Sequence, residues 1–129
     1  LSGKKLNEAK KKNIYNKLFK DEIINFLSKN KLNFNYFIAT DVFVYIGDLT
    51  EIFRLIKLRN KTVGKLVFST ENHVGEDFIL LQSGRYAHSK NYIESLCKKF
   101  NYKLSHFHTE PLRKEENSYI EGGLYLLDF

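Results

Sequence analysis

Hydrophobic positions along this chain switch between two spacings, and the switching predicts a layered α/β fold. The apolar segment at 34–39 lacks clean alternation, which is typical of a parallel strand buried on both faces, and 65–69 is a second expected strand with a polar end. Helical spacing follows each segment, in the first case at Leu49, Ile52, Phe53 and Ile56, and in the second at Tyr92, Ile93, Leu96, Cys97 and Phe100. Strands that alternate with helices in this way predict a mostly parallel sheet.

The remaining segments complete this expected order. Residues 17–20 are a candidate short strand, and Asp21 is placed to cap a following helix that ends before residue 31. Asp48 and Glu51 have the spacing of a capping box before the helix near residue 50. Residues 72–87 are expected to form a long connection, and Ser89 is expected to cap the next helix. The strands expected at 103–109 and 123–128 have no helical pattern between them, which predicts an antiparallel hairpin.

Composition and charge narrow the function classes. The 129 residues suffice for one domain with a real core, and no apolar run reaches the length of a membrane span. No basic-then-apolar leader is seen, so we expect a cytoplasmic protein. The single cysteine, Cys97, excludes an intramolecular disulfide and is expected to be buried and inert. The net charge is +6, and many of the lysines lie near the start of the chain. We interpret them as the solvated face of a helix over 4–12 rather than as a nucleic-acid interface.

Acidic residues stand at the ends of the expected strands. Asp41 directly follows the strand ending at Thr40, where open α/β sheets bind ligands, so we favour a functional carboxylate over a structural one. Asp21 and Glu71 occupy similar places after other expected strands, although a helix cap explains Asp21 equally well. Their spacing does not indicate a metal site, and we expect none.

Histidines and an arginine supply further candidates. His73 and His88 flank the expected long connection, and either could act as a general base near neutral pH, although a solvated loop histidine is the simpler interpretation. Arg85 and Tyr86 precede a helix N-terminus, where they could bind an anion or anchor the loop. His106 and His108 share one face of an expected strand without an obvious third metal ligand.

Taken in order, these segments resemble the carboxyl-terminal part of a class I S-adenosylmethionine-dependent methyltransferase. More narrowly, they are similar to the predicted methyltransferases associated with tetratricopeptide repeats. The matching residues span nearly all of the chain: Leu1-Ser2, 17–21, 38–48, 68–71, 84–89 and the last strand, Gly-Gly-Leu-Tyr-Leu-Leu. Residues 1–129 would then be the carboxyl-terminal portion of one such domain.

The resemblance implies roles for particular residues. Cofactor contacts are expected from Leu1, Asp21, Thr40, Asp41 and Val42. The acceptor side is expected to be lined by Tyr45, Arg85, Tyr86 and His88. Candidate bases are His73, His88 and Glu71, needed only if the acceptor must lose a proton. The implied cofactor is S-adenosylmethionine, and the implied partner is a small-molecule or protein acceptor.

The fold implied by the resemblance is Rossmann-like, mostly parallel, with a C-terminal antiparallel hairpin, and it lacks the first strands and the glycine-rich loop. Without them, the strand ending at Thr40 is expected to expose an unpaired edge, which an upstream repeat region or a partner chain could complete. Two other interpretations stay open: a non-catalytic interaction module derived from this fold, and a basic nucleic-acid-binding domain.

Overall fold

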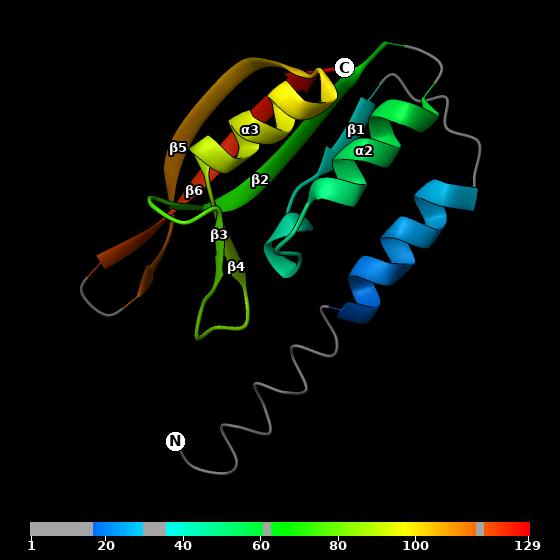
Figure 1. The fold of residues 1–129 in the computed structure, drawn as a ribbon. Coiled ribbons are helices and arrows are strands. Elements are labelled where there is room, and N and C mark those ends of the chain that lie inside the picture. The colour runs from blue at the N-terminus through cyan, green and yellow to red at the C-terminus, as the bar shows by residue number, and fades with distance from the viewer. Residues whose placement is uncertain (1–16, 30–35, 61–62, 116–117) are drawn as a thin grey trace.

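A computed structural model describes residues 17–29, 36–60, 63–115 and 118–129. Residues 17–29 are helical, and the chain then forms β1 (Tyr36–Ala39), the 3-10 turn η1 (Phe43–Tyr45) and α2 (Thr50–Arg59). The order continues with β2 (Lys65–His73), β3 (Phe78–Leu80), β4 (Tyr86–Ser89) and α3 (Lys90–Phe100). The strands β5 (Lys103–Glu115) and β6 (Ser118–Asp128) close the fold (Figure 1). The helix predicted at 4–12 lies outside the described residues, and so does the predicted cofactor contact Leu1.

The strands form one mixed sheet, which confirms the predicted α/β class. Its order is β3-β4-β2-β6-β5, and β1 pairs with β2 beside β4. Both β1 and β4 run parallel to β2, with β1 along the first half of that strand and β4 along its end. On the other side of β2, β6 is antiparallel and hydrogen-bonds to β5 as the predicted hairpin. Among the described strands, β2 is the only partner of β1.

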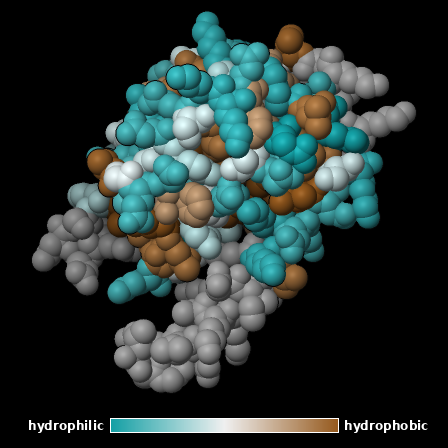
Figure 2. Space-filling view, in the orientation of Figure 1, coloured by the Kyte–Doolittle hydropathy of each residue, from teal (hydrophilic) through white to brown (hydrophobic). Residues whose placement is uncertain are grey.

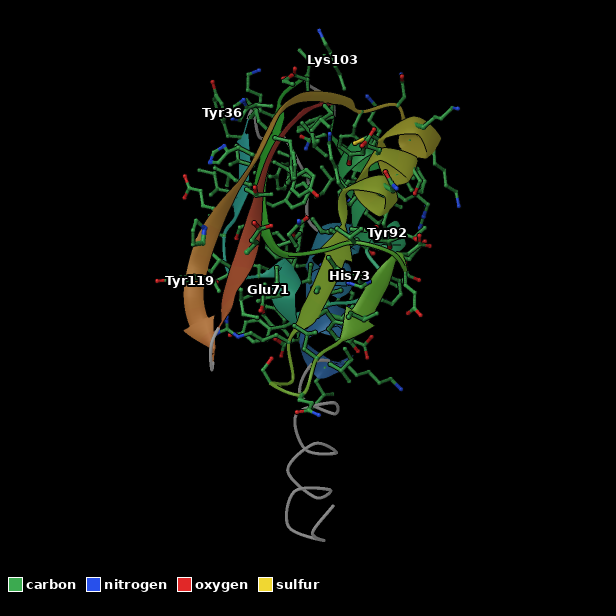
Figure 3. The ribbon with its side chains drawn as sticks, turned by 90° about the vertical axis from the view of Figure 1, so that its left-hand side faces the viewer. Tyr36, Glu71, His73, Tyr92, Lys103 and Tyr119 are labelled. Atoms are coloured by element: carbon green, nitrogen blue, oxygen red, sulfur yellow. The ribbon has the colours of Figure 1, made fainter. Side chains whose placement is uncertain are left out.

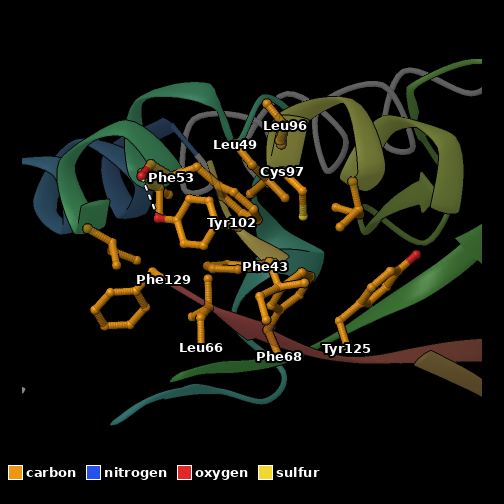
Figure 4. Packing of buried hydrophobic residues seen from close by; sticks show 14 of the residues in the cluster. Phe43, Leu49, Phe53, Leu66, Phe68, Leu96, Cys97, Tyr102, Tyr125 and Phe129 are labelled. Carbon is orange, nitrogen blue, oxygen red and sulfur yellow. Dashed lines mark hydrogen bonds between the residues drawn. The ribbon is translucent and has the colours of Figure 1, made fainter. Parts of the chain in front are cut away.

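The helices lie on one face of the sheet, and the core is the layer between them (Figures 1 and 3). The rings of Phe68 on β2 and Tyr125 on β6 stack at 4.9 Å, and both residues are fully buried. Figure 4 shows Phe53 of α2 and Tyr102 above them, where the Tyr102 hydroxyl donates a 2.6 Å hydrogen bond to the Phe53 carbonyl. Cys97 is buried there, as predicted. Seen from the helix side, hydrophilic side chains dominate the surface, and hydrophobic ones form scattered patches (Figure 2).

The opposite face of the sheet carries no helix in the described part of the chain. The pairing between strands identifies residues on that face. Ile38 on β1 pairs with Val67 on β2, Val67 pairs with Leu126 on β6, and Leu126 pairs with His106 on β5. Side chains alternate across a strand, so these four share one face, opposite to Phe68 and Tyr125. Val67 and Leu126 are half-buried, whereas Ile38 is 71% exposed. We call this surface the open sheet face.

Several local predictions were wrong, each for a physical reason. Residues 17–20 are helical, because Phe19 continues the apolar spacing of Ile23 and Leu27 onto the core. Asp21 is therefore inside a helix, neither its cap nor at a strand end. The capping box does not form, since Glu51 binds Arg54 in two hydrogen bonds of 2.8 and 2.9 Å.

Two further errors concern strand length. The expected long connection at 72–87 contains the β3–β4 hairpin, because β4 finds a partner at the end of β2 that the local sequence does not reveal. The strand expected at 103–109 does not end there but continues past Pro111 to Glu115. Since β5 lies at the sheet edge, a register shift between Pro111 and Arg113 accommodates the proline, and the strand continues.

Candidate functional site

The turn after β1 places Asp41 at the carboxyl-terminal edge of the sheet. Its backbone adopts φ 56°, a left-handed conformation that aspartate tolerates better than most residues. Its backbone N–H donates to the Ser69 hydroxyl of β2 at 3.2 Å, which ties the turn to the neighbouring strand. Thr40 and Asp41 are exposed and Val42 is half-buried. The predicted strand-end carboxylate is therefore open to a ligand.

Tyr45 and Arg85 come together near this edge, although 40 positions separate them in the sequence. The Arg85 guanidinium lies 5.8 Å from the centre of the Tyr45 ring, in a cation–π arrangement. Phe19 meets the same ring edge-on at 6.0 Å. Both Tyr45 and Arg85 are half-buried. The structure thus joins two of the residues predicted to line the acceptor side.

Tyr86 points into the fold rather than outward. A Cβ added at Gly47 would lie 2.7 Å from Cε1 of Tyr86 and 2.9 Å from the ring of Phe78, so Gly47 provides the space that these rings fill. The two rings meet edge-on at 6.3 Å. Tyr86 therefore fixes the position of the segment after η1.

His88 is fully buried on β4 and binds the same segment. Its Nε2 lies 2.8 Å from the Ile46 carbonyl oxygen and 3.0 Å from that of Gly47, so Nε2 carries the proton and donates to both. Burial lowers the pKa of His88 to about 4 and keeps the ring neutral. Such a histidine is a poor proton acceptor near neutral pH. Its position favours a structural role over the predicted roles as base or substrate ligand.

Tyr92 was not predicted to act at this edge, yet it completes the attachment of the 46–49 segment. Its hydroxyl accepts a 2.9 Å hydrogen bond from the Leu49 N–H and donates to Asp48 Oδ1 at 3.2 Å. Burial raises the pKa of Tyr92 to about 12, so the hydroxyl keeps its proton. The ring of Tyr92 stacks on His88 with centroids 6.1 Å apart. The apolar helical spacing identified Tyr92 as buried, but no sequence signal placed its hydroxyl at the loop.

Glu71 and His73 lie within β2 rather than beyond it. The predicted end of β2 near residue 70 was wrong, and Glu71 is completely buried opposite Ala87 of β4. His73 is half-buried, and its Nε2 is buried without a hydrogen-bond partner among the described residues. Of the three candidate bases, His73 is the one that is only half-buried, since Glu71 and His88 are fully buried.

Asp21 is exposed within helix 17–29. That helix borders a groove of about 470 Å³. Side chains of the helix, β1, the turn after β1, α2 and β2 line it: Glu22, Ile23, Phe26, Leu27, Phe37, Ile38, Ala39, Val42, Phe43, Ile52, Ile56 and Leu66. All but Glu22 are apolar. The groove runs beside the β1 strand, whose outer edge has no partner in the described chain.

Within residues 17–29, 36–60, 63–115 and 118–129, no cluster of three or more His, Cys, Asp or Glu side chains could hold a metal ion. In the same ranges, no helix has the length and hydrophobicity needed to cross a bilayer.

Solved structures that resemble this fold include S-adenosylmethionine-dependent methyltransferases. One from Methanosarcina mazei aligns with a TM-score of 0.59 at 12% identity, over 79% of this chain and 63% of its own. TehB from Haemophilus influenzae aligns with a TM-score of 0.57 at 12% identity, over 81% of this chain and 38% of its own. Magnesium protoporphyrin IX methyltransferase from Synechocystis, solved with S-adenosylhomocysteine bound, aligns with a TM-score of 0.55 at 9% identity, over 79% of this chain and 47% of its own.

At this level of identity, the comparison shows the fold. No protein-family profile matches the sequence, and no curated protein matches it. The chain spans between 38% and 63% of the length of these methyltransferases. It therefore has the fold of part of such a domain.

Proposed function

We propose that this chain is the carboxyl-terminal portion of a domain that transfers a methyl group from S-adenosylmethionine to an unidentified acceptor. The observation that carries the proposal is the likeness to several such methyltransferases over about four fifths of this chain. Asp41 also follows the end of the parallel strand β1, and strand ends are where open α/β sheets bind ligands.

The residues at this edge fit one side of the cofactor. Asp41 and Thr40 are exposed polar residues beside β2. The backbone N–H of Asp41 donates a hydrogen bond to the Ser69 hydroxyl of that strand, which positions the turn. A carboxylate there suits the positively charged donor. Asp21, on the exposed side of helix 17–29, remains a candidate for the adenine side.

The cofactor supplies an electrophilic methyl group on a sulfonium, so the protein's main task is positioning. The turn at Asp41 would orient the donor, and the Tyr45–Arg85 pair would form part of the acceptor wall. His88 and Tyr92 would keep the 46–49 segment in place behind that wall. If the acceptor must lose a proton, His73 is the candidate to receive it, because its side chain is half-buried whereas those of Glu71 and His88 are fully buried.

The chain needs additional structure to form this domain. The outer edge of β1 and the part of the open sheet face around Ile38, which is 71% exposed, lack covering elements in the described residues. Exposed strand edges and apolar faces favour association with further chain. An upstream region of the same protein or a partner chain would therefore complete the sheet, and a tetratricopeptide-repeat neighbour remains part of this proposal.

Thermal unfolding with cofactor tests the proposal on protein expressed from the full-length open reading frame. S-adenosylhomocysteine at a hundred times its Kd should stabilise the folded state by about 2.7 kcal/mol and raise Tm. Asp41→Asn, which removes the charge but keeps a side chain that tolerates this backbone conformation, should weaken that shift with little change in Tm of the free protein, whereas Asp77→Asn, at an exposed site in the β2–β3 turn, should not. Absence of any shift would refute methyl transfer and favour the interaction module. An undiminished shift in Asp41→Asn would refute only the position of the site.

A further inference from the structure

Three side chains on β5 form a hydrogen-bonded row that the proposed function does not use. His106, His108 and Glu110 alternate along the strand, so they all project from the open sheet face. His106 Nε2 lies 2.9 Å from His108 Nδ1, and His108 Nε2 lies 3.0 Å from Glu110 Oε1. The His108 and Glu110 side chains are 37% and 70% exposed, so solutes can reach the row from solvent.

The hydrogen bonds define which nitrogen carries which proton. A carboxylate only accepts, so His108 Nε2 carries a proton and donates it to Glu110. In neutral His108, Nδ1 then has a free lone pair, and it accepts the proton on His106 Nε2. One proton therefore lies between two facing ring nitrogens. A metal ion that displaces it would find two nitrogen donors side by side.

The spacing of these nitrogens indicates a type of ion. To bind one ion, both rings must turn so that their lone pairs point at it; with metal–nitrogen bonds of about 2.05 Å and the same 2.9 Å separation, the nitrogens subtend an angle of about 90° at the ion. A tetrahedral ion such as zinc would need them about 3.3 Å apart at that bond length. Angles near 90° belong to square-planar and octahedral complexes, and copper(II) and nickel(II) favour such geometry with nitrogen ligands.

Glu110 has the position of a supporting residue rather than a ligand. It binds the ring nitrogen of His108 that faces away from His106, so the three side chains do not converge on one point. This agrees with the absence of a three-residue metal cluster in the described chain. Histidine ligands commonly donate their second N–H to a carboxylate, which fixes the ring and strengthens the nitrogen donor.

We propose that His106 and His108 form a two-nitrogen surface site for copper(II) or nickel(II), positioned by Glu110, with water in the remaining coordination positions. Copper(II) should bind more tightly than nickel(II), as the usual order of divalent ions requires. The site lies on the edge strand, and it is independent of the proposed methyl transfer.

Titration calorimetry with copper(II) and nickel(II) chlorides, together with copper electron paramagnetic resonance, tests this site on the full chain. The protein should bind one copper ion saturably and give nitrogen hyperfine structure from imidazole. His106→Ala and His108→Ala should each weaken binding more than about tenfold, and Glu110→Gln by about tenfold with unchanged stoichiometry. His73→Ala, which alters another partly buried histidine, is the matched control and should bind like the unaltered protein.

Several results would overturn the proposal. One is copper binding of equal strength in the double variant His106→Ala, His108→Ala. Another is a preference for zinc over copper. Loss of binding in His73→Ala would assign the ion elsewhere. His106, His108 and Glu110 lie on the surface of the edge strand β5. Unchanged thermal unfolding of each variant without metal would show that the fold is retained.

Discussion

Acidification should destabilise the fold through His88, and His88→Gln should remove that effect. His88 is fully buried, and its pKa falls from the ordinary 6.5 to about 4 because burial disfavours the charged ring. Below about pH 6.5 the unfolded chain binds a proton at this position that the folded chain rejects. Stability contributed by neutral His88 is therefore complete above that pH, falls as the pH drops, and is lost at about pH 4.

The size of the effect follows from the two pKa values. Linkage between about pH 7.5 and about pH 5 gives a loss near 2 kcal/mol from this residue, and the full shift corresponds to about 3 kcal/mol. Glutamine can still donate to the Ile46 and Gly47 carbonyls but does not titrate. The His88→Gln protein will be less stable overall, so the informative quantity is the slope of its free energy of unfolding against pH.

Urea unfolding followed by circular dichroism at several pH values measures that slope. The His88→Gln protein should lose about 2 kcal/mol less than the unaltered protein between the two pH values. His106→Gln, which changes an exposed histidine, should leave the slope as it was. Equal slopes in the unaltered protein and His88→Gln would refute the reasoning, because His88 would then not be buried in its neutral form.

Two further predictions concern packing. Gly47→Ala should lower the free energy of unfolding by about 1–3 kcal/mol in urea titrations, because the new methyl would overlap the Tyr86 and Phe78 rings; an unchanged midpoint would contradict that contact. Cys97 should react slowly with iodoacetamide in the folded protein near pH 8 and rapidly in urea, because burial raises its pKa to about 11. Rapid labelling of the folded chain would contradict its place in the core.

Much of the fold was determined by spacing that the sequence itself displays. The helical period placed Ile52 and Phe53 of α2 and Ile93 and Leu96 of α3 in the core, where all four are buried. The cap at Ser89 was also predicted, and its hydroxyl accepts the Tyr92 N–H at 3.1 Å. These features depend on neighbours within one helical turn, so the local sequence contains the information.

The resemblance to methyltransferases gave the correct fold, and the site positions near β1 followed from strand ends. Thr40 and Asp41 do stand at the end of a parallel strand, as predicted. Their predicted contacts with cofactor stay predictions. The prediction that this strand is buried on both faces was wrong, because Tyr36 and Ile38 are 64% and 71% exposed on the open sheet face, which no described helix covers.

Only the tertiary structure decided how distant segments meet. The burial of His88 depends on carbonyls of Ile46 and Gly47, about 40 positions earlier, and it turns a candidate base into a structural donor. The strand β4 exists because the end of β2 leaves an edge beyond β1 for it to pair with. The contact between Tyr45 and Arg85 likewise joins segments that lie far apart in the sequence. Sequence periodicity reports which face of an element is buried, whereas the partner on that face is set by the packing of the whole chain.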